Sequence, residues 1–371
     1  MLDCRGRYLH AQELAALERR RRRRWRLALV ALAVAIVAGI AGGLIVWRVQ
    51  ADRTDAAQAE ARQQKLELAR GALYAKAVYT GHRDPLESVD FSPDSRRVVS
   101  ADQSGDIRVW DATTASELAR LHARGDVQHA VFSPDGSLVL AAAGSGKAYV
   151  WRWRDGKQVA SLSEPFGFEG AVFGPGGRLA ALPADDGTIR LWDWRAGRVV
   201  GVLNPGDEQR AVEFSRDGRL LAAQDEDGSV RIWDWRRQRV LAKLDAHSAT
   251  GSPNAIALSP DGRFLATAGQ LGAAVWDWRA RRVLWVKTAI DQYGYSAVAF
   301  SRDGREVAVS ESDDDAVHLW DWRRARQVAV LREGEGSVGL AVSPNGCLVA
   351  TAGYDPWARV WAPPLSGCRR S

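Results

Sequence analysis

The feature that most constrains this chain is a tryptophan that recurs at a nearly constant interval. The sequence has 16 Trp in 371 residues, and seven of them fall into one register. These seven are Trp110, Trp151, Trp192, Trp233, Trp276, Trp320 and Trp361. The intervals between them are 41, 41, 41, 43, 44 and 41 residues. A period of this length predicts a repeat architecture, in which each copy forms one supersecondary unit and packs against its neighbours.

Each repeat has the same internal order of apolar runs and turns. An alternating apolar stretch ends in Ser-Pro-Asp-Gly or a variant, and a second apolar run, an acidic turn and the Trp segment follow. Ser133-Pro134-Asp135-Gly136 and Ser259-Pro260-Asp261-Gly262 are two examples of the first turn. Because Pro and Gly set the dihedral angles of a tight reversal, these turns predict antiparallel strands. The repeat region is therefore predicted to be all-β.

These units resemble WD-repeat (Trp–Asp repeat) propellers, in which each repeat supplies the four strands of one blade. The resemblance covers 73–362 and implies a seven-bladed β-propeller. The Trp–Asp pair is intact at Trp110-Asp111, Trp192-Asp193, Trp233-Asp234, Trp276-Asp277 and Trp320-Asp321. It is degenerate at Trp151-Arg152 and Trp361-Ala362. The family's Gly-His dipeptide stands clearly only at Gly81-His82, so the resemblance implies a buried His–Asp network in that blade and leaves it doubtful in the other six.

A propeller must close, and the two ends of the repeat region indicate how. After Trp361 only ten residues remain, and the tail 363–371 has no strand pattern. The last blade therefore lacks an outer strand of its own. Leu73 to Thr80 look like the outer strand that precedes every other repeat, so we expect this segment to complete the seventh blade and remove an exposed edge.

The positive charge of the chain is concentrated in its first 26 residues. This basic tail carries nine Arg against three acidic residues, which accounts for the formal net charge of +6. The other 345 residues have no formal net charge. We therefore predict no nucleic-acid binding, and we interpret Arg19 to Arg24 as a topogenic cluster on the cytoplasmic side of a membrane.

An uncharged run follows the basic tail. From Leu27 to Trp47 the 21 residues are long enough to cross a membrane as a helix, which predicts a transmembrane span at 27–47. A cleaved signal peptide is the alternative. Ala31, Ala35, Gly39 and Gly43 recur every four residues and suggest a possible homodimer through this helix. Residues 48–72 are predicted to form a helical stalk, and the propeller is predicted to be exoplasmic on a bacterial cell membrane.

Five repeats carry a second Trp two places after the first. Because side chains alternate along a strand, both indoles share a face, and we expect the second ones to pack between blades. Strand order places the turns after these residues on the same rim as the Ser-Pro-Asp-Gly turns. This predicted basic rim includes Arg154, Arg195, Arg198, Arg236, Arg237, Arg281, Arg282, Arg323 and Arg324. We expect acidic turns on the opposite rim, and the basic rim to face anionic headgroups.

Motifs for chemistry are sparse in this sequence. Gly144-Ser145-Gly146-Lys147 lacks the first Gly and the final Ser or Thr of a phosphate-binding loop, and the six His have no metal-ligand spacing. We therefore predict no catalytic residues, no metal and no cofactor. Cys347 and Cys368 are expected near one rim of the last blade, where they could form a disulfide in an oxidising compartment.

The predicted function is a membrane-anchored scaffold or sensor module for protein partners, and not an enzyme. The layout of basic tail, span, stalk and Trp–Asp repeats also resembles the C-terminal half of bacterial STAND-type signalling ATPases. The alternative function is a metal-dependent propeller hydrolase or lyase. Its groups would have to meet in the central channel from residues such as His129, Glu213 and Asn254.

Overall fold

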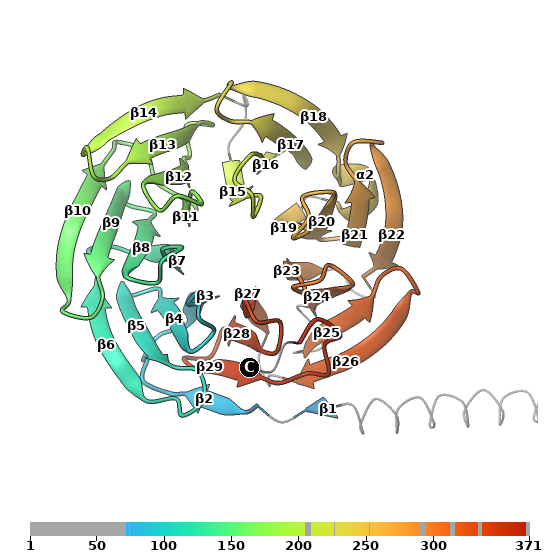
Figure 1. Ribbon diagram of the computed structural model, residues 1–371, viewed down its shortest axis with the longest axis horizontal. Coiled ribbons are helices and arrows are strands. Elements are labelled where there is room, and N and C mark those ends of the chain that lie inside the picture. The colour runs from blue at the N-terminus through green and yellow to red at the C-terminus, as the bar shows by residue number, and fades with distance from the viewer. Residues whose placement is uncertain are drawn as a thin grey trace, which may run out of the picture. The chain divides into compact units, whose positions relative to one another are not determined.

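The computed structural model describes residues 72–73, 75–204, 209–225, 227–251, 253–289, 294–311, 316–332 and 336–368. Within them the strands form seven sheets, antiparallel apart from one added strand, which are arranged around a central axis, as Figure 1 shows. Blade 1 is β3 (Leu86–Phe91), β4 (Arg97–Asp102), β5 (Asp106–Asp111) and β6 (Glu117–His122). Blade 2 is β7 (Val127–Phe132), β8 (Leu138–Ala143), β9 (Lys147–Arg152) and β10 (Lys157–Ser163). Blade 3 is β11 (Val172–Phe173), β12 (Leu179–Pro183), β13 (Ile189–Asp193) and β14 (Arg198–Leu203).

The remaining blades repeat the same order from the axis outward. Blade 4 is β15 (Gln209–Phe214), β16 (Leu221–Asp225), β17 (Ser229–Asp234) and β18 (Arg239–Asp245). Blade 5 is β19 (Pro253–Leu258), β20 (Phe264–Gly269), β21 (Gly272–Asp277) and β22 (Arg282–Thr288). Blade 6 contains β23 (Tyr295–Phe300), β24 (Glu306–Glu311), β25 (Ala316–Asp321) and β26 (Arg326–Arg332). Blade 7 contains β27 (Ser337–Val342), β28 (Val349–Gly353) and β29 (Ala358–Trp361).

An N-terminal strand closes the ring, as predicted, but of the expected segment Leu73 to Thr80 only Ala77–Tyr79 pair with blade 7, and Leu73 pairs with blade 6. The outer strand of blade 7 is β2 (Ala77–Tyr79), which pairs antiparallel with β29 so that Val78 lies opposite Arg359. Figure 1 shows β2 on the outside of β29, near the C-terminus. Just before it, β1 (Ala72–Leu73) pairs in parallel with β26 and adds a fifth strand to blade 6. The N-terminal segment of the repeat region therefore contacts two blades.

The Ser-Pro-Asp-Gly turns owe their sequence to a hydrogen-bond arrangement that recurs in six blades. In blade 2 the Ser133 hydroxyl donates to Asp135 at 2.5 Å and accepts the Leu138 backbone N–H at 2.9 Å. Gly136 follows with a φ of 68°, a left-handed conformation that favours glycine. Blade 3 has Gly174-Pro175-Gly176-Gly177 at this place, with neither the Ser nor the Asp.

The apolar core lies mainly between neighbouring blades. Between blades 1 and 2, for example, Val99 and Ile107 pack in one cluster with Phe132, Val139 and Trp151. Small residues on the inner strands allow adjacent sheets to approach closely, and outer strands such as β14 alternate exposed and partly buried positions.

The predicted fold class needs one correction. The all-β, seven-bladed part is confirmed, but the transmembrane helix and helical stalk that we predicted ahead of it are not found. In the described part of the chain the one helix is α2 (His247–Thr250), and no helix there is long and apolar enough to cross a membrane. Leu27 and Trp47, with the rest of 27–47 and most of 48–72, lie outside the described residues.

The stalk prediction is wrong at its C-terminal end. Ala72 was expected to end a helix, whereas its backbone lies in β1, opposite Val330. An unpaired outer strand offers free backbone N–H and C=O groups, and pairing with β26 satisfies groups that a helix would have satisfied internally.

Candidate functional site

The predicted blade-motif residues occupy equivalent places on the third strand of every blade. Of the seven register tryptophans, all but Trp320 are buried, and Trp320 is partly buried. The Asp of each intact pair ends the strand and accepts backbone N–H groups of the following turn. Asp111, for example, accepts the N–H groups of Thr113 and Thr114 at 2.8 and 2.9 Å. The Trp–Asp motif is therefore a structural element, with the indole in the core and the carboxylate in the turn.

Blade 1 contains the complete buried network that the Gly81-His82 dipeptide implied. His82 Nδ1 lies 2.8 Å from Asp102 Oδ2, and its Nε2 lies 2.7 Å from the Ser100 hydroxyl. The Trp110 indole N–H donates to the same hydroxyl at 3.1 Å. Burial alone would raise the pKa of Asp102, but the hydrogen bonds from His82 and from a neighbouring serine outweigh it and hold this pKa below its usual value.

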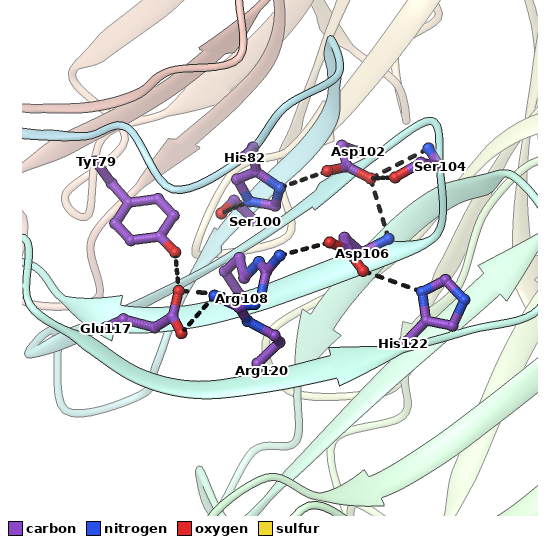
Figure 2. A network of polar contacts seen from close by, with 10 residues as sticks. All are labelled: Tyr79, His82, Ser100, Asp102, Ser104, Asp106, Arg108, Glu117, Arg120 and His122. Atoms are coloured by element: carbon purple, nitrogen blue, oxygen red, sulfur yellow. Dashed lines mark hydrogen bonds and ion pairs between the residues drawn. The ribbon is translucent and has the colours of Figure 1, made fainter.

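A second set of polar contacts extends from this network to the closing strand (Figure 2). Tyr79 of β2 donates its hydroxyl to Glu117 of β6. The buried Arg108 lies beside that Glu117 and pairs with Asp106 at 2.5 Å. Burial and the bond to Glu117 raise the pKa of Tyr79 well above its usual value, so the phenol keeps its proton. The chain end that closes blade 7 is thus linked to blade 1 through polar side chains.

The other blades retain only parts of the network. In blades 5 and 7 the indole N–H groups of Trp276 and Trp361 donate to Thr267 and Thr351 at 3.0 and 2.9 Å. In blades 3, 4 and 6 an apolar residue stands at the place of the hydroxyl: Leu182, Ala223 and Val309. The buried indole nitrogens of Trp192, Trp233 and Trp320 have no hydrogen-bond partner in the described residues.

This difference predicts opposite effects of two small substitutions. Ser100→Ala leaves the His82 Nε2 atom and the Trp110 indole N–H without this partner and should lower the free energy of unfolding by about 2 kcal/mol. Ala223→Ser gives the Trp233 N–H an acceptor and should raise it by about 1 kcal/mol. Urea titrations of the two variants measure both. A loss of stability in Ala223→Ser would show that steric crowding dominates at this place.

Buried ion pairs, which the sequence reasoning missed, are a second contact that recurs in several blades. An Arg two residues before the register Trp reaches an acid at the end of the second strand or in the turn that follows it. Arg190 pairs with Asp186 at 2.6 Å, and Arg359 pairs with Asp355 at 2.5 Å. Arg231 forms the same kind of pair with Asp225. The sequence does contain an Arg two residues before the register Trp in these blades, but the acidic partner stands at a variable distance along the chain.

The second tryptophans connect two turns of the same blade. Their indole N–H groups donate to the carbonyl of the turn glycine at 2.8–3.1 Å, as Trp153 does to Gly136. These bonds place both sets of turns on one rim, as predicted. The expected packing between blades is found at Trp322, whose ring lies 5.1 Å from that of Phe264 in blade 5.

The arginines of the predicted basic rim divide into three groups. Four of the predicted members stack on the preceding indole: Arg154, Arg195, Arg236 and Arg323. Two pair with the Asp of the Trp–Asp motif: Arg237 and Arg324. The side chains of three are exposed and make no hydrogen bond or ion pair with the described residues: Arg198, Arg281 and Arg282.

The same rim also carries many carboxylates, so the charges are less separated than we expected. Asp135, Asp217, Asp261 and Asp303 lie in its turns, and the last of these is 3.7 Å from Arg305. Much of the acidic set expected on the opposite rim falls at 205–208, 312–315 and 333–335, outside the described residues. Local pairing of rim charges is therefore seen, whereas an acidic opposite rim stays a prediction.

The inner strands enclose a channel with a volume of about 670 Å³. About half of the residues that line it are Ala, Gly or Val, whose small size leaves the space open. By strand order, Glu87 and Glu169 line one mouth, and Arg216 and Arg302 line the mouth at the basic rim. A channel of this size and lining is a candidate for a ligand site.

Two carboxylates in the channel wall hold neighbouring blades together. Asp90 accepts the Phe132 N–H of the next blade at 3.0 Å, and Glu213 accepts the Leu258 N–H at 2.5 Å. Burial raises the pKa of Glu213 to about 8 and that of Asp90 to about 6, and the backbone hydrogen bonds oppose the shift.

His129 lies in the same wall and hydrogen-bonds the Ala171 carbonyl at 2.8 Å, and burial lowers its pKa. The structure thus brings His129 and Glu213 to the channel, as the enzyme alternative required. No group of three or more His, Cys, Asp or Glu that could hold a metal ion is found in the part of the chain that the structure describes.

The raised pKa of Glu213 predicts a pH-dependent stability difference. Between its usual value of 4.5 and about 8 the folded state holds a proton that the unfolded state releases. The protonated carboxyl group therefore contributes fully to the free energy of unfolding below pH 4.5, and this contribution is lost as the pH rises through 8. Glu213→Gln stays neutral, so above pH 8 it should be more stable than the natural chain by about 2 kcal/mol, because partial exposure to the channel limits the effect. Equal stability of the two chains at pH 5 and pH 9 would contradict this.

The C-terminal tail crosses from blade 7 to blade 6 on the basic rim. Cys347 and Cys368 are joined by a disulfide, with Cα atoms 4.4 Å apart. Between Trp361 and Cys368, Leu365 is buried in a cluster with Ala308, and the Ser366 hydroxyl bonds Asp303 and Glu306 at 2.9 and 2.6 Å. Whether the two thiols are oxidised in the cell stays a prediction.

The closed ring of seven blades, with Trp–Asp turns in most of them, places this fold in the class of repeat propellers. The family model "WD domain, G-beta repeat" matches 74–111, 116–152, 199–234, 238–277, 291–321 and 326–362. The matched segments make up more than half of the chain, which therefore belongs to the WD40 repeat family. The unmatched stretch 153–198 includes most of blade 3, whose first turn lacks the Ser and Asp. No curated protein matches the chain.

Proposed function

We propose that this protein is a non-catalytic scaffold whose propeller binds protein partners. Membership of the WD40 family supports protein binding, because such propellers are typically interaction platforms. The observation that carries the non-catalytic part is the use of the channel side chains. Asp90, Glu213 and His129 each form a hydrogen bond to the backbone of the next blade. Such contacts are structural.

Capture of partners under native conditions tests this function. The full chain, tagged at its C-terminus and recovered from its own cells, is expected to retain a discrete protein in fixed stoichiometry. The double variant His129→Ala and Glu213→Gln should retain it equally well. An isolated chain that hydrolyses ester or phosphoester substrates, and loses this activity in the double variant, would contradict the proposal and favour the enzyme alternative.

The compartment of the propeller belongs to the same proposal. We place it on the exoplasmic side, where a Cys347–Cys368 disulfide can persist, and this cysteine pair supports an oxidising environment. Protease should digest the propeller in cells whose outer layers have been made permeable while the cytoplasmic membrane remains intact. Digestion only after the cytoplasm is opened would reverse the assignment. Membrane anchoring and a homodimer have no support in the described residues, and the similarity to STAND-type ATPases stays a prediction.

A further inference from the structure

In blades 2 to 6 an arginine guanidinium lies over an indole ring and has no acidic partner among the described residues. In blades 5 and 6 this arginine, Arg279 or Arg323, also donates to a turn carbonyl, whereas the guanidinium in blades 2 to 4 makes no hydrogen bond with the described residues. Arg154 lies 4.7 Å from the centre of the Trp153 ring, and Arg195 lies 5.1 Å from that of Trp194. Arg236 lies 4.9 Å from the ring of the preceding Trp in blade 4. All three are exposed on the basic rim. We call Arg154, Arg195 and Arg236 the arginine arc.

The carboxylates closest in sequence to the arc are already paired with other arginines. In blade 2 Asp155 pairs with Arg152 at 2.7 Å. In blade 3 Asp193 pairs with Arg178 at 2.7 Å, and the pKa of this Asp is lowered by that contact first and by backbone hydrogen bonds next. The equivalent Asp of blade 4 pairs with Arg237. In each of the three blades the acid closest in sequence to the arc arginine is therefore paired with another arginine and does not pair with the arc.

The indole rings under the arc are fixed before any partner arrives. Trp153, Trp194 and Trp235 each donate the indole N–H to a turn carbonyl, at 3.0, 2.8 and 3.1 Å. A guanidinium stacked on a ring uses its flat face, and its N–H edges remain available for the two oxygens of a carboxylate. Because the side chain is held in place, less conformational entropy is lost when an anion binds.

We propose that the arginine arc binds an acidic polypeptide segment, with successive Asp or Glu side chains on successive blades. The proposal rests on the proposed function and names the chemistry of its partner. The surrounding surface favours discrete carboxylates over an anionic bilayer. Asp135 and Asp217 lie in turns of the same rim, where a flat plane of negative headgroups would meet them as well.

A fluorescent ten-residue poly-Glu peptide, titrated into the full chain, tests the arc. All proteins in the comparison carry Arg19 to Arg24 replaced by Ser, so that the basic tail does not compete. The triple variant Arg154→Gln, Arg195→Gln and Arg236→Gln should bind about tenfold more weakly at low salt. The matched control replaces Arg83, Arg124 and Arg332 by Gln, which removes the same charge from the opposite rim, and should change affinity less than twofold.

A second variant keeps the charge and changes the shape. Arg→Lys at the three arc positions retains the positive charge without the planar fork, and an intermediate affinity is expected. A photo-crosslinking version of the peptide should label the turns that contain the arc. Unfolding curves of all variants separate loss of binding from loss of folding.

Three outcomes would overturn the proposal. Equal weakening in the arc variant and in the opposite-rim control would show a response to net charge alone. Crosslinks outside blades 2–4 would place the peptide elsewhere. Arc-dependent binding to vesicles with about 30% phosphatidylserine, with poly-Glu binding unaffected, would assign the surface to a bilayer. If the arc variant loses poly-Glu but still retains the cellular partner, the scaffold function stands and the partner uses another surface.

Discussion

Tyr79→Ala is expected to lower the free energy of unfolding by about 4 kcal/mol, the largest effect of any single substitution considered in this chain. Tyr79 is 5% exposed and lies on the strand that completes blade 7. Its ring stacks on that of Trp110 in blade 1, with the centroids 5.3 Å apart and the planes within 8°. The substitution removes this contact and the hydroxyl bond to Glu117, and both join the first and last blades.

Tyr79→Phe is the matched control, since it keeps the ring and removes only the hydroxyl. It should cost about 1 kcal/mol, the usual net value of one hydrogen bond. Guanidinium unfolding followed by tryptophan fluorescence measures both variants. A loss below 1 kcal/mol in Tyr79→Ala would mean that β2 contributes little to closure, and that blade 7 is stable with three strands.

Removal of the Cys347–Cys368 disulfide is expected to lower the free energy of unfolding by about 3 kcal/mol. The two cysteines are 21 residues apart in sequence, and a cross-link of this length restricts the unfolded chain by about that amount in the chain-entropy account. The double variant Cys347→Ser and Cys368→Ser should therefore unfold at lower denaturant under oxidising conditions.

Two comparisons separate the disulfide from the packing of the tail. In reducing buffer the natural chain should become as unstable as the double variant, while Cys4→Ser should leave stability unchanged. A variant that matches the natural chain in oxidising buffer would indicate that the burial of Leu365 and the bonds of Ser366 hold the tail without the cross-link.

The blade count and the closure could be predicted because both follow from the register of the repeat. Seven tryptophans at intervals of 41 to 44 residues mark the third strand of each of seven blades. The short tail after Trp361 contains no strand pattern, so the outer strand of the last blade was expected from elsewhere in the chain. The same register predicted that Trp153 and its equivalents share a rim with the Ser-Pro-Asp-Gly turns, which their bonds to the turn carbonyls reproduce.

The polar contacts were harder to predict because they depend on pairs of residues at variable spacing. Arg190 reaches an Asp four residues earlier, whereas Arg231 reaches one six residues earlier. The stacking of Arg154 and its equivalents on indoles depends on side-chain geometry in a turn, and the number of charged residues in the sequence does not predict it. Strand β1 was missed because two residues beside an edge carry no alternating pattern.

Hydrogen exchange of the segment 75–80 tests the closed seven-bladed ring most directly. In this account β2 and β29 protect each other, with the Lys76 N–H bonded to the Val360 carbonyl at 2.7 Å. Peptides covering 75–80 and 358–361 in the full chain should therefore exchange slowly, at rates within about tenfold of each other, because both become accessible only when blade 7 opens. Exchange of 75–80 at the rate of an unstructured peptide, with 358–361 still protected, would contradict closure by the N-terminal strand.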